Sequence, residues 1–391
     1  LERMSQPLSL LDHPEENYPI IHVTGTNGKG SSIAFMSQLF AEHKKKVGTF
    51  TSPHMVSIYD RICVNHKPIS DKDFVRIGRR IQAMERQLLR TQDSLSYFEI
   101  LTLIALLYFE EEQVDVALIE VGIGGLLDTT NVVTGDIAVV TSVGLDHQET
   151  LGDSIAAIAE QKTGIFKEKK VAVIGPLTEE VRRVCELHAK KLDVVLYEYG
   201  RDFSFSKGKF FSSDVNIPHL KLSLVGTYQE ENALQSFLLF MKQQNWQPQV
   251  KWIRKALQET HWAGRLEYFE RGIYLDGAHN LPALSRLVEF IRQQGQKEIF
   301  LLFGALKRKN YQGMLSYLQQ ELPHVQLFVT TFEDDGAANE QDFTNGLYIA
   351  SYQDFIEQFI KSANDNQLLF VTGSLYFIAE VRAFLLEKEI D

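Results

Sequence analysis

Apolar runs alternate with helix-like segments through the first 175 residues of the chain. The runs are rich in Val and Ile, and helical patterns separate them, which is typical of βαβ units in a mainly parallel sheet. Another apolar run, ILTLIALLYF at residues 100–109, is too short to span a bilayer and predicts a buried helix. We expect the buried strands to be formed by residues 19–25, 46–52, 114–122, 137–144 and 170–175.

The pattern changes after residue 193. Residues 193–225 alternate and contain turn signals, as antiparallel hairpins do, and helical patterns follow at about 228–258. The stretch ETHWAGRLEYFERG has two glycines and no apolar period, so it predicts a linker at about 259–270. The βα rhythm then resumes in GIYLDGA, EIFLLFG, VQLFVTT and LLFVTG. We therefore expect two α/β domains, residues 1–262 and 263–391, the first with helices on both faces of its sheet and a small antiparallel element.

Composition narrows the class of protein. A chain of 391 residues is long for one core, and 44% hydrophobic with 23% charged residues is typical of a soluble globular protein without a membrane partner. The two cysteines, Cys63 and Cys185, argue against a disulfide framework and favour the cytoplasm. The net charge of −11 argues against nucleic acid as a partner. The first residues, LERMSQ, are not a signal peptide, and the lack of an initial Met favours a trimmed start.

The segment HVTGTNGKGSS (residues 22–32) follows the first predicted strand and looks like a phosphate-binding loop. In such a loop, backbone N–H groups and a helix N-terminus bind phosphate, and the lysine neutralises phosphate oxygens. The common nucleotide loop places a hydroxyl that binds Mg²⁺ directly after the lysine, whereas Gly30 follows Lys29 here. The alternative is a glycine-rich turn without a ligand. If the loop binds ATP, the hydroxyl for the metal comes from elsewhere.

Polar residues follow the neighbouring predicted strands. Because the carboxyl ends of parallel strands open onto one crevice, Ser52, Glu120, Asp146 and His147 are expected at the same sheet edge as the loop. Each has an ordinary explanation as a turn residue, a paired carboxylate or a helix cap. Together, hydroxyl and carboxylate oxygens suit Mg²⁺, while imidazole is a less usual ligand.

Lys162 lies seven residues after Ile155, on the apolar stripe of a helix predicted within residues 153–166. One explanation is a lysine that reaches from the edge of the stripe into water. The other is a desolvated lysine with a lowered pKa. A neutral amine can act as a nucleophile, and it can also react with CO₂ to form a carbamate, which carries a negative charge.

These motifs together resemble the folylpolyglutamate synthase and dihydrofolate synthase family, part of the Mur ligase superfamily. The similarity runs through nearly the whole chain in the family's order, although the family's N-terminal helical segment before LERM is absent. The resemblance implies that ATP phosphorylates the terminal carboxylate of a folate and that L-glutamate then attacks the acyl phosphate. It is carried by TGTNGKGSS, TSPH, YFEILT, EVGIGGLLDTTN, TSVGLDH, LGDSIAAIAEQKTGIFK, WAGRLE, LDGAHN and VTGSLYFIAEVR.

The resemblance also implies roles for individual residues. Lys162 corresponds to a carbamylated lysine, and residues 55–62 match a loop near the folate. His279 and Ser374 lie where glutamate binds, and His279 is also a candidate catalytic residue. Metal ligation falls on Ser52, Glu120 and His147. ATP contacts fall on Asn27, Gly28, Lys29, Gly30, Ser31, Asn232, Arg265 and Asp276. We expect ATP as a substrate, two Mg²⁺ ions with a monovalent cation as a further candidate, and a monomer.

The chemistry of such a ligase also requires these residue types. The two carboxylates and the triphosphate that must come together repel one another, so metal ions and fixed cations are needed to hold them. Arg265, in the predicted linker, would act only when the domains close over the substrate. The chain departs from the family pattern at Leu126, where Arg is usual, at Leu281, where Pro is common, and in the basic stretch 306–310. Dihydropteroate is a second candidate acceptor. The alternative function is a Mur-type ligase that adds an amino acid to a peptidoglycan precursor.

Overall fold

The computed structural model describes residues 2–88, 94–213, 215–222 and 230–388. These residues form two compact units. Within the described ranges, unit 1 contains residues 2–52, 58–222 and 230–261, and unit 2 contains residues 53–57 and 262–388. Among the described residues, no helix is long and apolar enough to cross a membrane.

Unit 1 is built on an eight-stranded sheet in the order β4-β3-β2-β5-β1-β6-β7-β8. The strands from β2 to β8 along this order are parallel, and β3 and β4 form an antiparallel edge. The predicted parallel strands are therefore confirmed as the middle of this sheet. The bounds are β1 Ile20–Thr24, β2 Val47–Phe50, β3 Ile62–Val64, β4 Lys67–Pro68, β5 Val116–Glu120, β6 Ile137–Val140, β7 Val171–Ile174 and β8 Val195–Glu198.

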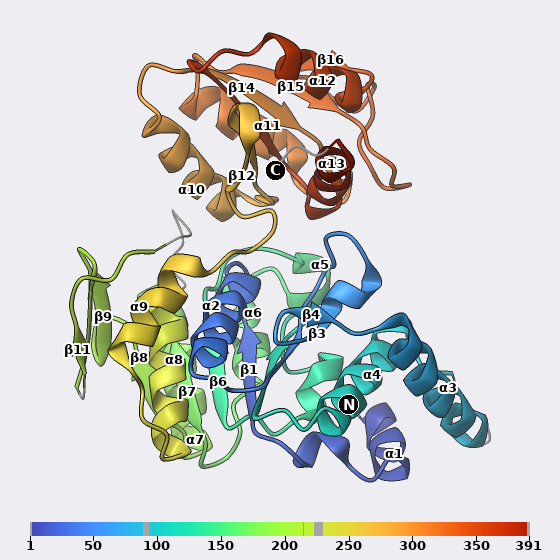
Figure 1. Cartoon of the computed structure of the whole chain (residues 1–391), viewed down its shortest axis with the longest axis vertical. Helices are drawn as coiled ribbons and strands as arrows, with labels where there is room; N and C mark the ends of the chain where they lie inside the picture. The colour runs from blue at the N-terminus through green and yellow to red at the C-terminus, as the bar shows by residue number, and fades with distance from the viewer. Residues whose placement is uncertain (1, 89–93, 214, 223–229, 389–391) are drawn as a thin grey trace. The chain divides into compact units, whose positions relative to one another are not determined.

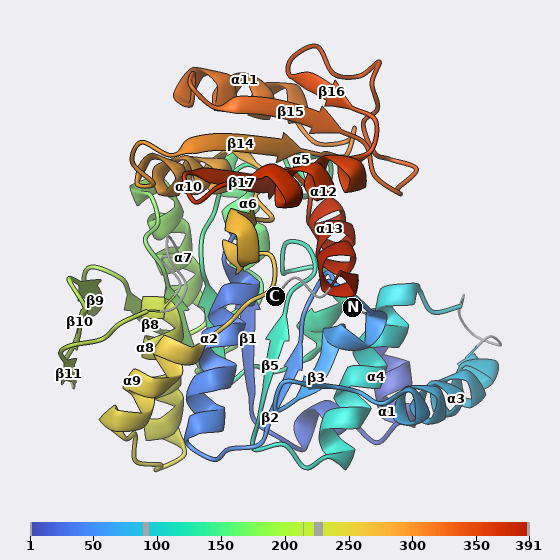
Figure 2. The ribbon, with the colours of Figure 1, turned by 45° about the horizontal axis from the view of Figure 1, so that its top comes forward.

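Helices cover both faces of this sheet (Figures 1 and 2). Helix α2 packs with α8 and α9, while α1, α3 and α4 share one core with the strands and α6 packs with α7. The predicted buried helix is confirmed as α4, which begins with a capping box between Ser96 and Glu99. The bounds are α1 Glu2–Leu10, α2 Lys29–Glu42, α3 Asp71–Leu88, α4 Tyr97–Glu111, α5 Gln148–Leu151, α6 Ile155–Thr163, α7 Glu179–Lys191, α8 Glu230–Gln243 and α9 Val250–Glu259, with 3₁₀ turns η1 Pro14–Glu16, η2 Ile58–Arg61 and η3 Thr129–Val132.

The prediction of hairpins throughout 193–225 is wrong for β8, which pairs in parallel with β7. Helix α7 supplies the crossover that a parallel strand requires. The antiparallel element is the three-stranded sheet of β9 (Phe203–Ser206), β10 (Lys209–Ser212) and β11 (Asn216–Ile217). Part of the predicted segment, residues 214 and 223–225, lies outside the described residues.

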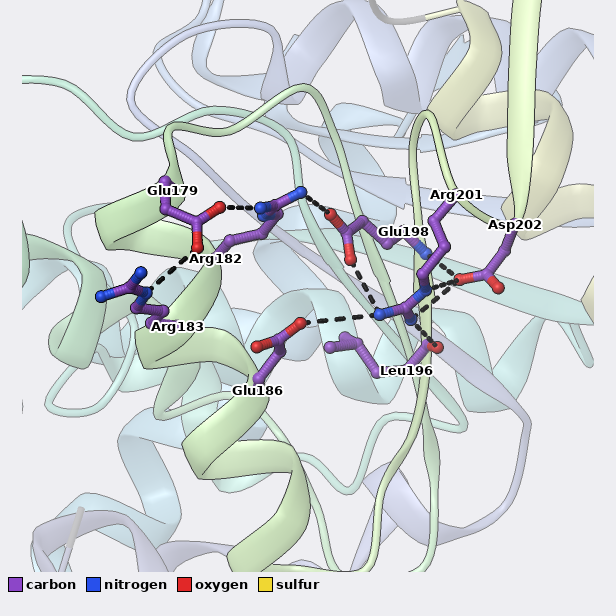
Figure 3. A network of polar contacts seen from close by, with 8 residues as sticks. All are labelled: Glu179, Arg182, Arg183, Glu186, Leu196, Glu198, Arg201 and Asp202. Carbon is purple, nitrogen blue, oxygen red and sulfur yellow. Dashed lines mark hydrogen bonds and ion pairs between the residues drawn. The ribbon is translucent and has the colours of Figure 1, made fainter.

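A charged cluster ties β8 to α7 (Figure 3). The carboxylate of Glu198, whose side chain is 3% exposed, accepts a hydrogen bond from Arg182 Nη1 at 2.9 Å and lies 2.9 Å from Arg201 Nη1. Arg182 also pairs with Glu179, and Arg201 pairs with Asp202. The two arginines compensate the buried carboxylate, which would otherwise be costly to desolvate.

Unit 2 contains a six-stranded sheet in the order β12-β13-β17-β14-β15-β16, parallel except for β12. The predicted strands of this half are confirmed, whereas β16 was not predicted and β12 lies within the stretch expected to be a linker. The bounds are β12 Glu267–Phe269, β13 Ile273–Leu275, β14 Glu298–Phe303, β15 Gln326–Thr330, β16 Leu347–Ile349 and β17 Gln367–Thr372, with η4 Glu270–Gly272 and helices α10 Leu281–Arg292, α11 Tyr311–Glu321, α12 Tyr352–Ser362 and α13 Leu375–Glu387.

Candidate active site

The glycine-rich loop joins the end of β1 to the start of α2 and needs its glycines for two different reasons. Gly28 has φ 84°, a left-handed conformation that favours glycine. Gly25 lies so close to Thr141, the residue directly after β6, that a Cβ atom there would overlap Thr141 Oγ1. The loop can therefore turn sharply into the helix, whose first residue is Lys29. Backbone N–H groups at such a helix start are suited to phosphate.

Hydrogen bonds from the residues after β6 fix this loop. Asn27 N donates to Ser142 Oγ at 2.9 Å, and Asn27 O accepts from Ser142 Oγ at 2.9 Å and from Thr141 Oγ1 at 2.7 Å. Gly144 N donates to Thr26 Oγ1 at 2.9 Å. Thr26 and Ser142 were not predicted as positioning residues, although polar residues close to the ends of apolar strands are the signal that identified Ser52 and Glu120.

The structure brings Lys29, Glu120 and Ser52 together. Lys29 Nζ donates to Gly25 O at 2.9 Å and lies 3.9 Å from Glu120 Oε1. Glu120, at the end of β5, is 4% exposed, and its Oε2 accepts a hydrogen bond from Ser52 N at 3.0 Å. The loops after three parallel strands therefore meet around one buried carboxylate. Ser31, in the first turn of α2, is buried, and Gly30 is half-buried.

His147 is the third predicted metal ligand. It is exposed, has φ 50°, and precedes α5, and its Nε2 is 3.9 Å from Asp146 Oδ2. Within the described ranges, Glu120, Asp146 and His147 do not form a set whose ligand atoms lie within 4.8 Å of one another. Of the three predicted metal ligands, the structure joins Ser52 to Glu120 through a hydrogen bond.

Lys162 is 3% exposed in the last turn of α6. This burial is the main reason that its pKa is lowered to about 7, and the positive charge of Lys29 lowers it further. The negative charges of Asp146 and Asp128 act in the opposite direction. Because the side chain is buried, the explanation that the lysine reaches into water is wrong. With this lowered pKa, a substantial fraction of the amine is neutral near pH 7.

Asn232, on α8, is completely buried next to Gly175, where a Cβ atom would lie 2.6 Å from Asn232 Nδ2. Among the described residues, neither polar atom of its amide has a hydrogen-bond partner. A buried amide without partners costs about 1–3 kcal/mol. A donor and an acceptor are therefore held in place at a position where the resemblance implies an ATP contact.

Arg265 and Asp276 lie together in unit 2. Asp276 Oδ2 accepts from Leu266 N at 3.0 Å and Oδ1 accepts from Ala278 N at 3.0 Å. Burial raises the pKa of Asp276, and the positive charge of Arg265 opposes this increase. The segment around Arg265 is held by a hydrogen bond from Gly277 N to Gly264 O at 2.8 Å.

His279 and Ser374 occupy neighbouring loops of unit 2. His279 Nδ1 lies 2.8 Å from Gly277 O, and because a carbonyl only accepts, Nδ1 carries the proton. Ser374 is 3% exposed, and its hydroxyl accepts from Tyr376 N at 3.2 Å as the N-cap of α13. A hydrogen bond from Gly373 N to Ala278 O at 3.1 Å joins the two loops. The predicted folate loop is divided, because residues 53–57 belong to unit 2 and η2 belongs to unit 1.

Comparison with known proteins agrees with this geometry. The Mur ligase middle domain matches residues 23–240, and the Mur ligase glutamate ligase domain matches residues 264–375. A dihydrofolate synthase/folylpolyglutamate synthase of Bacillus subtilis is 34% identical over 98% of this chain and 94% of that protein. A solved complex of folylpolyglutamate synthase with AMPPCP and folate has a TM-score of 0.87 and 32% identity, covering 98% of this chain and 94% of that one. A bifunctional folylpolyglutamate synthase/dihydrofolate synthase with Mn, AMPPNP and L-glutamate bound has a TM-score of 0.87 and 27% identity, covering 99% of this chain and 94% of that one.

Proposed function

The chain belongs to the folylpolyglutamate synthase and dihydrofolate synthase family of the Mur ligase superfamily, and we propose that it is an ATP-dependent ligase that adds L-glutamate to the terminal carboxylate of a folate. The observation that carries the proposal is the meeting of the glycine-rich loop, Glu120 and Ser52 at the ends of parallel strands. This arrangement combines phosphate-binding N–H groups with hard oxygen ligands, as ATP with a divalent metal requires.

ATP and a divalent metal fit the residues present. Residues 27–31 would hold the phosphates, and the buried amide of Asn232 has a donor and an acceptor available for the nucleotide. Arg265 and Asp276 complete the proposed ATP contacts. Ser52, Glu120 and His147 would hold magnesium, which supplies positive charge beside the phosphates. We propose two Mg²⁺ ions and, in addition, a monovalent cation. Solved relatives with AMPPCP, and with Mn and AMPPNP, support the use of nucleotide and metal.

In the proposed reaction, the carboxylate of the folate acceptor is activated and then converted to an amide in two steps. The acceptor's carboxylate attacks the γ-phosphorus of ATP, ADP leaves, and an acyl phosphate forms. The amino group of glutamate then attacks the acyl carbon, loses a proton and releases inorganic phosphate, which leaves an amide bond. Lys29 lies where it can neutralise phosphate oxygens during the first step. We place the incoming glutamate at His279 and Ser374, with His279 as a further candidate catalytic residue.

Lys162 is proposed to act as its carbamate. CO₂ adds only to the neutral amine, and the lowered pKa of about 7 makes that form available near neutral pH. The neutral amine adds CO₂ and releases a proton, so a side chain that is a cation when protonated becomes an anion and the sign of charge beside Lys29 is reversed. A carbamate can accept hydrogen bonds from water and from the metal's hydration shell, which an ammonium cannot do.

The names of the relatives support two acceptors, dihydropteroate and a folate. The Bacillus subtilis protein is named as both dihydrofolate synthase and folylpolyglutamate synthase, so we include dihydropteroate beside folates in the proposal. The Mur-type alternative has less support, because the Bacillus subtilis relative and the solved relatives are folate enzymes. The proposal includes a monomer that works in the cytoplasm, and the two free cysteines, Cys63 and Cys185, are consistent with a reducing compartment.

The test is a product assay with labelled L-glutamate, ATP and Mg²⁺. The acceptors are tetrahydrofolate, dihydropteroate and a UDP-linked muropeptide, each measured with and without ATP. We expect ATP-dependent incorporation of label into tetrahydrofolate, and into dihydropteroate if the enzyme is bifunctional. Extension of the muropeptide without extension of either pterin acceptor would contradict the proposed function.

A further inference from the structure

A histidine that the proposed reaction does not use lies in the middle of the large sheet. His22 is in β1, between β5 and β6, and is 0% exposed. Its Nε2 lies 2.9 Å from Thr130 Oγ1, which is also 0% exposed. Buried polar groups in the middle of a sheet are expected to have a specific partner, because leaving one unpaired is costly.

The hydrogen bonds fix the direction of this chain of contacts. Thr130 Oγ1 is 2.6 Å from Asp128 Oδ1, and a carboxylate only accepts, so the single hydroxyl proton points to Asp128. Thr130 Oγ1 must then accept a hydrogen bond from His22, which places the imidazole proton on Nε2. Burial lowers the pKa of His22 to about 3, so the ring is neutral. Among the described residues, its Nδ1 has no hydrogen-bond partner.

Asp128 uses the same carboxylate to close the loop that follows Glu120. Its Oδ1 also accepts from Thr130 N at 2.9 Å, and its Oδ2 accepts from Ile123 N at 2.8 Å. One side chain therefore holds both the beginning and the end of the loop formed by residues 122–131. Asp128 is 8% exposed, so these hydrogen bonds are poorly accessible to competing water.

The same loop holds the end of the helix that carries Lys162. Leu126 N donates to Gln161 O at 2.7 Å, and Asn131 Nδ2 donates to Leu126 O and to Gly164 O, each at 3.1 Å. A Cβ atom at Gly125 would lie 2.7 Å from Gln161 O, so the loop backbone and the helix end are in direct contact. The contacts are continuous from β1, through the loop, to α6.

We propose that His22 and Thr130 are positioning residues whose buried hydrogen-bond chain orients Asp128 and so sets the place of Lys162 relative to Glu120. The inference rests on the proposed function for its effect on turnover, because Glu120 and Lys162 are its metal-binding and carbamate residues. Neither His22 nor Thr130 touches the reacting groups. Their effect is on geometry, and a displacement of about 1 Å at a reacting group can cost roughly a hundredfold in rate.

Thr130→Val and Thr130→Ser form a matched pair. Valine keeps the shape of threonine but has no hydroxyl, whereas serine keeps the hydroxyl and loses only a methyl group. We expect Thr130→Val to lower kcat about tenfold or more, with the KM for ATP within about twofold, because the glycine-rich loop is untouched. Thr130→Ser should stay within about threefold of the wild type.

Amide hydrogen exchange gives a second measurement that does not depend on activity. Removing the Thr130 hydroxyl should speed exchange at the Ile123 and Leu126 amides roughly tenfold, because Asp128 loses a partner that orients it. Serine at the same position should leave these rates near those of the wild type. Normal turnover in Thr130→Val, or unchanged exchange at both amides, would overturn the inference.

Nitrogen NMR of His22 in the wild-type protein covers the case in which Thr130→Val does not fold. A neutral ring with its proton on Nε2 between pH 5.5 and 8 is expected, and a proton on Nδ1 would overturn the inference. If the wild type does not ligate glutamate at all, the proposed function fails. Hydrogen exchange then decides the positioning role on its own.

Discussion

The two units place similar loops at the ends of their parallel strands but use polar side chains there in different ways. In unit 1, Lys29 lies 3.9 Å from Glu120, and Lys162 is buried where the charges of Lys29 and Asp128 reach it. In unit 2, Asp276 accepts hydrogen bonds from its own backbone neighbours, and Ser374 caps a helix. Charged side chains therefore act on one another around Glu120 and Lys162 in unit 1. In unit 2, Asp276 and Ser374 hold local backbone, although the charge of Arg265 also acts on Asp276.

This difference indicates a division of labour. A site that handles phosphoryl transfer brings several charged groups together, and in unit 1 burial lowers the pKa of Lys162, with a smaller contribution from the charge of Lys29. A site that binds a small amino acid needs rigid loops that present a few hydrogen-bonding groups. We therefore expect substitutions in unit 1 to affect the chemical step most, and substitutions in unit 2 to affect closure over the substrate or the binding of glutamate.

The largest effect is expected for Glu120→Gln. The substitution keeps the shape of the side chain and removes the negative charge next to the proposed metal, so turnover should fall roughly a thousandfold. Steady-state kinetics with varied Mg²⁺ would measure this fall in turnover.

Glu198→Gln is the control, because Glu198 is an equally buried carboxylate at the end of another strand of the same sheet. It should lower the free energy of unfolding by about 1–3 kcal/mol and leave turnover within about twofold. Near-normal turnover of Glu120→Gln would make Glu120 a structural residue.

Lys162→Ala should lose roughly a hundredfold or more in turnover, because it removes the proposed carbamate and its negative charge. Under the carbamate hypothesis, high concentrations of acetate should partly restore activity, since acetate supplies the missing negative charge. Lys162→Arg keeps the positive charge and should remain inactive with or without acetate. An active arginine variant, or an unmodified ammonium on phosphate in a high-resolution complex, would exclude the carbamate and weaken the contrast between the units.

The fold followed from the sequence more completely than the site did. The Val- and Ile-rich runs predicted the parallel strands because buried strands need apolar residues on both faces. The same reasoning failed at β8, which joins the parallel sheet although it lies in a stretch of alternating, turn-rich sequence. The burial of Lys162 was visible as a lysine on an apolar stripe. The support from Thr130 was not, because a hydrogen bond between segments more than 100 residues apart, such as His22 to Thr130, leaves no local pattern.

Arg265→Ala tests the role of unit 2 in closure. Its contact with ATP is proposed to form only when the units close, so kcat should fall about tenfold to a hundredfold while the Kd for ATP changes less than about threefold. Stopped-flow turnover and equilibrium ATP binding would measure the two quantities. Arg382→Ala is the control, because Arg382 pairs with Glu267 at 3.0 Å within the same unit and should change kcat only slightly. Equal losses of kcat and ATP affinity in Arg265→Ala would place the arginine in an open binding site.

The lowered pKa of Lys162 also makes stability depend on pH when CO₂ is absent. Between pH 7 and about 10, the unfolded chain holds a proton on this amine more often than the folded chain does, so stability should rise with pH across this window. The slope from one such group is about 1 kcal/mol per pH unit. Urea unfolding at pH 7.5 and 8.5 would measure it, and Lys162→Met should remove this slope. An identical slope in both proteins would show that the amine is not desolvated.

The smallest effect is expected at Ser374, where stability and glutamate binding can be separated. Ser374→Ala removes the N-cap of α13 and should lower the free energy of unfolding by about 1 kcal/mol. Glycine at this position costs only a few tenths of a kcal/mol as a cap, so Ser374→Gly removes the hydroxyl and leaves the helix nearly intact. If the hydroxyl also binds glutamate, both variants should raise the KM for glutamate about fivefold, in line with the loss of one neutral hydrogen bond. A normal KM in Ser374→Gly, with reduced stability only in Ser374→Ala, would limit the role of Ser374 to capping and move glutamate recognition to His279 and its neighbours.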